Sequence, residues 1–359
     1  MSETVLSVKD LTITYRVAGR GVAAVDGVSF EVEPGEILGI VGESGCGKST
    51  LSAALLGLLP RNGAIVNGEI GLRGESLVGA TAERMRQLRG GQIAMVFQDP
   101  LTSLNPTFTI GAQLVDALRA HGPGRGSRAE MRERVVAALS SVGIPAAHER
   151  VDSYPHELSG GQRQRVMIAT ALMLEPAVLV ADEPTSSLDV TLEAQILHLL
   201  DRLRREHDTA IVLISHDLGV IAQSCDRVIV MYAGRQVESG DVAELFQSPR
   251  HPYTQALLAA APSLSRRRQR LLSIEGRVPS LSALPEGCKF APRCSYTQDV
   301  CHEREPGLDA VGSQLVRCHA YDKDSGYRGN VAQLTSSQEE APARQSDRPT
   351  EASARTSDA

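Results

Sequence analysis

The 359-residue sequence contains no tryptophan, and aromatic residues make up only 3% of it. This scarcity argues against a protein that stacks nucleobases on a row of aromatic side chains. A basic excess is missing too, since the net charge is −6 at pH 7. Nucleic-acid-binding domains usually carry such an excess, so we expect no nucleic-acid partner.

Long apolar runs are also absent. No stretch reaches the ~20 apolar residues that a membrane-spanning helix requires, and the first residues lack the basic and apolar regions of a secretory signal. We therefore expect membrane association only through partner proteins. The hydrophobic content of 42% is ordinary for a globular protein, so a normal core is expected.

Cysteine is infrequent, with six in the chain. In an intracellular protein of this size a disulfide framework is a poor interpretation. Four of the six lie close together in the sequence, between residues 288 and 318. Lysine is scarcer still, and one of its four occurrences, Lys48, lies inside a glycine-rich loop.

This loop fits the phosphate-binding pattern G-x-x-x-x-G-K-[ST]. An apolar run (37–41) precedes it and a helical pattern (49–59) follows, which is the strand–loop–helix context that the pattern requires. The loop N–H groups and the helix N-terminus suit phosphate, Lys48 can reach the β- and γ-phosphates, and the Ser49 hydroxyl can bind Mg²⁺. The predicted nucleotide-binding residues here are Gly42, Glu43, Ser44, Gly45, Cys46, Gly47, Lys48, Ser49 and Thr50.

Two carboxylates follow a second apolar run, at residues 178–181. Carboxylates at the end of a buried strand are costly unless they bind a cation or transfer a proton. Asp182 is predicted to bind Mg²⁺. Glu183, beside the γ-phosphate, is predicted to act as the general base toward the attacking water.

The order of the segments predicts an α/β core. Short apolar runs alternate with helical patterns, which favours a largely parallel sheet. The first 32 residues are rich in strand-like runs, and residues 99–165 contain an amphipathic helix, Arg128–Val142, without a strong strand, so we expect a helical insertion there. The predicted strands are 5–8, 11–15, 28–32, 37–41, 178–181, 210–214 and 227–231, and the other predicted helices are 191–206 and 253–261.

With these motifs in place, residues 5–255 resemble the ABC ATPase family. The resemblance rests on the P-loop, the acidic pair, the signature Leu158–Gln162 at a helix start, the D-loop 187–189 and a histidine after strand 210–214. It implies ATP hydrolysis by two such domains that close head to tail, each ATP lying between one P-loop and the other signature. It further implies roles for Tyr15 on adenine, Gln98 with Ser49 and Asp182 at Mg²⁺, Ser159, Gly160, Gly161 and Gln162 across the interface, Asp189 in the D-loop, and His216 at the γ-phosphate.

Two segments resemble a narrower group, the ATP-binding subunits of oligopeptide/dipeptide importers: residues 99–106 and residues 249–254. This resemblance implies peptide uptake with two transmembrane permease subunits, an extracytoplasmic substrate-binding protein and a second ATP-binding subunit, either identical or similar. It implies a peripheral location on the cytoplasmic face of the cell membrane.

Other functions stay open at this point. Relatives in the same group carry nickel or glutathione, and the ATPase does not touch the cargo. A soluble non-transport ABC ATPase is less favoured because the chain has one signature and no heptad stretch. A module that binds ATP without turnover is disfavoured by the intact Glu183 and His216.

The C-terminal cysteines resemble a further feature of the importer subunits. Cys288, Cys294, Cys301 and Cys318 would correspond to the ligands of a [4Fe–4S] cluster. Four thiolates suit iron–sulfur or zinc, and the spacing lacks the paired C-x₂-C of common zinc sites. Zinc and the absence of any metal remain alternatives, and ligation by His302 or His319 would favour zinc.

We expect three parts along the chain: an ABC ATP-binding domain (1–255), a C-terminal region with the cysteines (256–325) and a disordered tail (326–359). The tail is polar and too poor in apolar residues to bury a core. The basic run 266–270 is interpreted as a solvated face.

Overall fold

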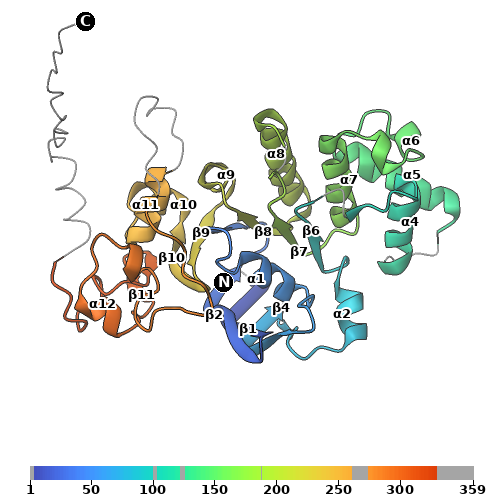
Figure 1. Ribbon diagram of the computed structural model, residues 1–359. Helices are drawn as coiled ribbons and strands as arrows, with labels where there is room; N and C mark the ends of the chain where they lie inside the picture. Colours follow the sequence, from blue (N-terminus) through green and yellow to red (C-terminus); the bar gives the residue numbers. More distant parts are fainter. Residues whose placement is uncertain (1–3, 100–102, 122–125, 187, 261–273, 330–359) are drawn as a thin grey trace, which may run out of the picture.

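The computed structural model describes residues 4–99, 103–121, 126–186, 188–260 and 274–329 (Figure 1). These residues form an antiparallel sheet of order β2-β1-β4-β5 and a mixed sheet of order β11-β12-β10-β9-β3-β8-β7-β6. The strands from β9 to β6 are parallel, and β10, β12 and β11 continue the sheet in antiparallel fashion. The predicted α/β class with a largely parallel core is confirmed.

The strands are β1 (Leu6–Val17), β2 (Arg20–Val32), β3 (Ile37–Val41), β4 (Gly63–Leu72), β5 (Glu75–Ser76), β6 (Ile93–Val96), β7 (Val178–Asp182), β8 (Ala210–Ser215), β9 (Arg227–Tyr232), β10 (Arg235–Asp241), β11 (Asp309–Val311) and β12 (Gln314–Val316). The helices are α1 (Lys48–Leu55), α2 (Ala82–Leu88), α4 (Ile110–His121), α5 (Arg128–Ser141), α6 (Ala147–Arg150), α7 (Gly160–Leu172), α8 (Val190–His207), α9 (Leu218–Ser224), α10 (Val242–Gln247), α11 (Pro252–Ala260) and α12 (Asp299–Glu303). Short 3-10 turns lie at Pro155–Glu157 and Ala291–Arg293.

The core sheet separates two apolar layers. In β7, Leu179 and Ala181 face one layer, which the helices α4, α5, α7 and α8 complete. The alternate residues Val178 and Val180 face the other, which is formed with α1 and the N-terminal sheet. Figure 1 shows this arrangement, with α7, α8 and α9 on one side of the sheet and α1 and β1 on the other. Strands buried on both faces explain why these segments read as continuous apolar runs.

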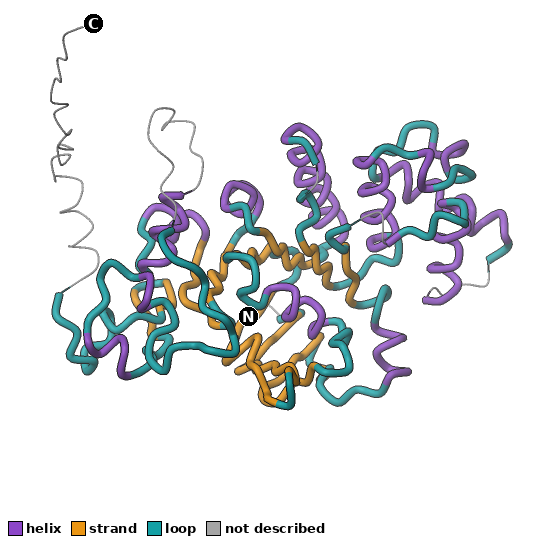
Figure 2. The backbone as a smooth tube through the Cα atoms, in the orientation of Figure 1, coloured by secondary structure: helices purple, strands orange, loops and turns teal. Residues whose placement is uncertain are grey.

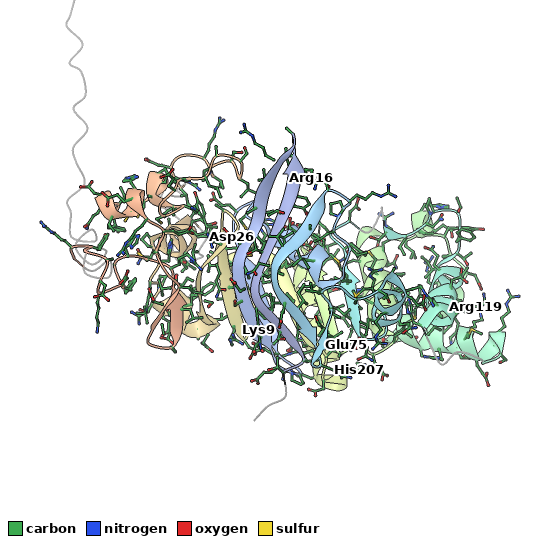
Figure 3. The ribbon with its side chains drawn as sticks, turned by 90° about the horizontal axis from the view of Figure 1, so that it is seen from below. Lys9, Arg16, Asp26, Glu75, Arg119 and His207 are labelled. Carbon is green, nitrogen blue, oxygen red and sulfur yellow. The ribbon has the colours of Figure 1, made fainter. Side chains whose placement is uncertain are left out.

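The N-terminal strand β1 is longer than predicted. The sequence suggested two short strands, but the structure has one continuous strand. Its pairing with β2 shifts register between Val8 and Leu11. Asp10 has a left-handed φ of 45° at this irregularity, as at a β-bulge. Figure 3 shows Lys9 and Arg16 at opposite ends of this strand.

The predicted helical region lies at the β6 end of the core sheet. Residues 103–121 and 126–165 contain α4, α5, α6 and the start of α7, and no strand among the described residues. Helix α5 begins as predicted because Ser127 and Glu130 form a capping box. Helix α1 ends earlier than predicted, since Gly57 adopts a φ of 61° beyond its C-terminus.

The C-terminal region is not a separate layer. Strand β12 pairs with β10, so β11 and β12 extend the core sheet at the end opposite the helical region (Figures 1 and 2). The predicted C-terminal region with the cysteines thus shares the core sheet through β12, and Phe290 packs in the core of the ATPase part. The basic run 266–270, tail residues 330–359, Ser187 and residues 100–102 lie outside the described residues.

Candidate nucleotide site

The P-loop joins β3 to α1 and depends on glycines at two left-handed positions. Gly45 has a φ of 82° and Gly47 a φ of 106°. A Cβ at Gly47 would lie 2.3 Å from the carbonyl oxygen of Ala24, which excludes any larger residue. Gly47 also precedes the first turn of α1, so the loop and the helix N-terminus present N–H groups to the same space.

Lys48 is held inside this loop. Its Nζ donates to the carbonyl oxygens of Gly42 (2.6 Å) and Glu43 (3.2 Å), and the side chain is almost fully buried. Burial raises the pKa of the Cys46 thiol, which keeps it uncharged. Cys46 is therefore a loop packing residue rather than a reactive thiolate.

Glu183 meets two distant side chains at the carboxyl end of the core strands. Its Oε2 accepts from Gln98 Nε2 at 2.7 Å, and its Oε1 lies 3.1 Å from His216 Nδ1. Glu183 has a φ of 47°, an unfavourable conformation for a non-glycine residue. Its N–H is bonded to the Ile214 carbonyl, which holds this conformation. Backbone strain of this kind gathers at functional sites.

Asp182, the last residue of β7, points to α1. Its Oδ2 accepts a hydrogen bond from Ser52 at 3.0 Å. Burial raises the pKa of this carboxyl, and the nearby charge of Glu183 adds to the increase. A carboxylate in this setting is stabilised by a cation, and the Ser49, Asp182 and Gln98 oxygens are donors that suit Mg²⁺.

Lys48, Gln98, Glu183 and His216 line one pocket of about 590 Å³, whereas Asp182 and Cys46 lie outside its lining. Tyr15 lies at its wall, and the Tyr15 and Thr50 hydroxyls are 3.2 Å apart. The pocket is lined by Tyr15, Ala24, Ser44, Gly45, Gly47, Lys48, Ser49, Thr50, Gln98, Glu183, His216 and Leu281. The structure thus brings most predicted nucleotide residues together, from segments that lie far apart in sequence.

The signature and D-loop residues do not line this pocket. Ser159 is the N-cap of α7 and forms a capping box with Gln162, so Gly160 and Gly161 open that helix. Asp189 is the N-cap of α8 and accepts from the N–H groups of Thr191 and Leu192. Within one chain these residues have the structural role of helix caps.

Sequence reasoning missed five residues of this site. Ser52 holds Asp182, Ala24 and Leu281 line the pocket, and Tyr253 and Arg293 contact Glu43. Ser52 lies three residues after Ser49 on the same helix, and residues at this spacing share a helix face, so the sequence could have indicated Ser52. Nothing local marks Leu281, Tyr253 or Arg293, because their contacts arise only from the packing of the C-terminal region.

The four C-terminal cysteines are free thiols, and the Cys288 N–H donates to the Cys301 carbonyl oxygen at 2.8 Å. Burial raises the pKa of Cys288 to about 11 and those of Cys294 and Cys318 to about 12, and neighbouring thiols add to each increase. Among the described residues, no group of three or more Cys, His, Asp or Glu side chains has an arrangement that could hold a metal. His319 is buried, and its Nδ1 has no hydrogen-bond partner. The predicted metal centre therefore stays a prediction.

Comparison with known proteins agrees with this site. The ABC transporter family matches residues 25–186, and the oligopeptide/dipeptide transporter C-terminal region matches residues 237–301. Among solved structures, the dimeric bacterial ABC transporter cassette MJ0796 is 28% identical, with a TM-score of 0.60 over 66% of this chain and 98% of that one. Fold and pocket together define an ABC-type ATPase, and the predicted enzyme class is confirmed.

Similarity to curated proteins indicates to which group of ABC transporter proteins the chain belongs. A putative peptide import ATP-binding protein of Brucella abortus is 46% identical over 87% of this chain and 94% of its own length. The dipeptide transport ATP-binding protein DppD of Haemophilus influenzae is 43% identical over 89% of this chain and 97% of its own length. The chain belongs to the ATP-binding proteins of the oligopeptide/dipeptide ABC transporters.

Proposed function

We propose that this chain is the ATP-hydrolysing subunit of an ABC importer that takes up dipeptides or oligopeptides. The observation that carries the proposal is the combination of a complete ATP pocket with the importer-type C-terminal region. The names of relatives over nearly the whole chain support peptides as the cargo.

In this proposal Lys48 and the P-loop N–H groups hold the phosphates of ATP, and Tyr15 stacks on adenine. Ser49, Asp182 and Gln98 bind Mg²⁺, which supplies positive charge at the phosphate oxygens. Catalysis then consists of positioning and charge stabilisation. Lys48 and Asp182 are both buried, so water is largely excluded around them.

Glu183 is the proposed general base. His216 and Gln98 contact its two oxygens from opposite sides and orient them toward the pocket. An oriented carboxylate beside the γ-phosphate accepts the proton of the attacking water. His216 also lines the pocket, where we propose that it contacts the γ-phosphate.

Glu183→Gln tests this assignment. Glutamine keeps the size of the side chain but removes the basic oxygen, so ATP hydrolysis should fall by roughly 10²–10⁴-fold. ATP affinity should remain close to that of the wild type, measured with a fluorescent ATP analogue. Lys48→Ala is the contrasting variant, expected to lose ATP binding itself. A Glu183→Gln protein that kept most of its hydrolysis would refute the general-base role.

Hydrolysis is proposed to occur in a head-to-tail pair of ATP-binding subunits. The signature residues Ser159, Gly160, Gly161 and Gln162 lie apart from this chain's own pocket, at a helix N-terminus with partial positive charge where Ser159 and Gly160 are exposed. They can therefore serve the ATP of a second subunit, with Asp189 beside them. The dimeric form of MJ0796 supports this arrangement.

An apolar groove is the proposed docking site for a permease subunit. It has a volume of about 310 Å³ and lies between the end of α1, β6, α4 and α7. Leu58 and Phe97 at this groove are 42% and 45% exposed, which is unusual for large apolar side chains. Phe97 precedes Gln98, so a helix in the groove would contact the segment that leads into the ATP pocket.

Docking of this kind explains how the subunit reaches the membrane. No helix among the described residues has the length and hydropathy to span a bilayer. We propose a peripheral position on the cytoplasmic face, with two permease subunits and an extracytoplasmic binding protein completing the importer.

A [4Fe–4S] cluster at Cys288, Cys294, Cys301 and Cys318 is proposed as a structural cofactor. The match of the oligopeptide/dipeptide transporter C-terminal region to residues 237–301, which contain three of the four cysteines, supports it. Zinc is the alternative. Its ligands would include His319, whose Nδ1 lacks a partner.

Anaerobic purification of the full chain tests the cofactor. A band near ~400 nm with about four iron and four sulfide per chain would support the cluster. A colourless protein with about one zinc would replace it with a zinc site. A metal-free protein whose stability is unchanged by iron, sulfide or zinc would refute both.

A further inference from the structure

The apolar wall of the ATP pocket comes from a distant segment. Leu281 lines the pocket with Ala24, Tyr15 and the P-loop, although it lies more than two hundred residues after Lys48. It belongs to residues 274–284, a segment without helix or strand between α11 and the cysteines, in which a turn is closed by the Ala283 N–H and the Ser280 carbonyl oxygen. We call this segment, residues 274–284, the strap. Most of the other side chains around the pocket are polar or charged, so Leu281 gives the nucleotide an apolar contact surface.

Arg293 fixes the strap to the P-loop. Its guanidinium forms a two-pronged ion pair with Glu43, at 2.6 Å and 3.1 Å, although the two residues are 250 positions apart. The same side chain donates to the carbonyl oxygens of Ile274 and Glu275 at the start of the strap. One arginine therefore holds the P-loop and the strap at the same time.

The contact between Arg293 and Glu43 is partly buried and well supported. The Arg293 side chain is only 4% exposed. Its pKa is raised above the usual value, first by the hydrogen bonds to Glu43. The Glu43 side chain is 28% exposed, so the pair is partly buried, and its two parallel hydrogen bonds fix the geometry more tightly than a single surface contact would.

A cluster of aromatic side chains packs between the segment of Arg293 and the P-loop. Phe290 packs against Tyr232 and Tyr253, with ring centroids at 5.2 Å and 5.4 Å. The Tyr253 hydroxyl accepts a hydrogen bond from the Glu43 N–H at 2.9 Å. The P-loop is thus bonded to the C-terminal half through both the backbone and the side chain of Glu43.

We propose that the C-terminal region forms part of the nucleotide site, with Leu281 as an ATP-contacting residue and Arg293 as a positioning residue for the P-loop. This inference rests on the proposed function, since it assigns two further residues to the same ATP pocket. It makes the C-terminal region a determinant of nucleotide affinity, in addition to its structural contribution to the core sheet.

Leu281→Ala tests the contact directly. The substitution removes a half-buried apolar side chain at the pocket wall, so the Kd for a fluorescent ATP analogue should rise roughly tenfold. Leu284→Ala is the matched control on the same strap, because Leu284 packs against the core and does not line the pocket. It should lower the thermal stability and leave the Kd unchanged.

Arg293→Gln tests the positioning role. The KM for ATP should rise roughly tenfold while kcat changes little, because the chemical groups Glu183 and His216 are untouched. The KM of Arg293→Lys should lie between those of Arg293→Gln and the wild type, since lysine keeps the charge but not the two-pronged geometry. The double variant Glu43→Gln, Arg293→Gln should have a KM for ATP no higher than that of either single variant, because both changes remove the same contact.

Arg317→Gln is the control for loss of a buried arginine. Arg317 donates to the carbonyl oxygens of Gln236 and Pro306 and does not contact the P-loop. An equal rise in KM for this variant would show a general structural effect and overturn the proposal. Unchanged nucleotide affinity in Leu281→Ala and Arg293→Gln would overturn it as well. A wild-type chain that fails to bind ATP would refute the proposed function instead.

Discussion

His251 is a buried, uncharged histidine at the start of α11. Its Nδ1 accepts a hydrogen bond from the Tyr253 N–H at 3.0 Å, which a protonated ring could not do. Burial lowers its pKa from 6.5 to about 3. Between these values the unfolded chain binds a proton that the folded chain does not. The contribution of His251 to stability is therefore complete above pH 6.5 and is lost as the pH falls toward 3.

His251→Asn tests this pH dependence. Asparagine can keep the acceptor for the Tyr253 N–H but does not titrate. Between pH 6.5 and about pH 5, the wild type should lose about 2 kcal/mol of unfolding free energy that the variant does not lose. Denaturant unfolding at both pH values measures the difference, and all other groups titrate equally in the two proteins. Identical pH profiles would mean that His251 has the same pKa in the folded and the unfolded chain, which would refute the buried neutral ring.

At the scale of elements, the groove between α1, β6, α4 and α7 gives a prediction about coupling. Leu58→Asp places a charge on the groove surface without touching the ATP pocket. Peptide uptake by cells that express the whole transporter should be lost, because a buried unpaired charge would oppose helix docking. The ATPase activity of the purified chain should remain.

Val66→Asp is the control for an added surface charge. Val66 is 57% exposed on β4 and lies outside the groove, so uptake should persist. Normal uptake in Leu58→Asp cells would exclude the groove as the permease contact.

Elements with strong local patterns agree closely with their predictions. Strand β3 has the predicted bounds, and α8 differs from its prediction by one residue at each end. Strands β4, β5, β6, β10, β11 and β12 were missed. In β10, Gln236, Glu238 and Ser239 are buried polar residues, so the apolar pattern that indicates a buried strand is absent. The Glu238 carboxylate accepts from the Arg250 and His251 N–H groups, and the Gln236 amide donates to the Ser239 hydroxyl; only the folded chain provides these partners.

At the scale of the whole molecule, Glu183→Gln makes the two-subunit proposal testable. With ATP bound and not hydrolysed, the closed pair should accumulate, because opening follows hydrolysis. Light scattering of the variant should show twice the monomer mass with ATP and the monomer mass without it. If the partner is a different ATP-binding subunit, the shift should require that chain. A monomer with ATP, both alone and in the presence of the second ATP-binding subunit, would contradict head-to-tail pairing.

The ATP motifs were readable from the sequence because each is local. The P-loop and the pair Asp182–Glu183 are short contiguous segments whose residue types follow from phosphate and Mg²⁺ chemistry. Their order along the chain was sufficient to indicate the family, and the α/β alternation was sufficient for the fold class. The apolar runs of β3, β7 and β8 determined which strands would be buried.

Only the tertiary structure decided how distant segments meet. Gln98 and Glu183 are 85 residues apart and Glu183 and His216 are 33 apart, and they touch because β6, β7 and β8 are neighbours in the sheet. The addition of β12 to β10 likewise places Arg293 and Leu281 beside the P-loop. Such contacts depend on strand order and packing, which no local pattern contains, so the ATP motifs were visible in the sequence while the C-terminal wall of their pocket was not.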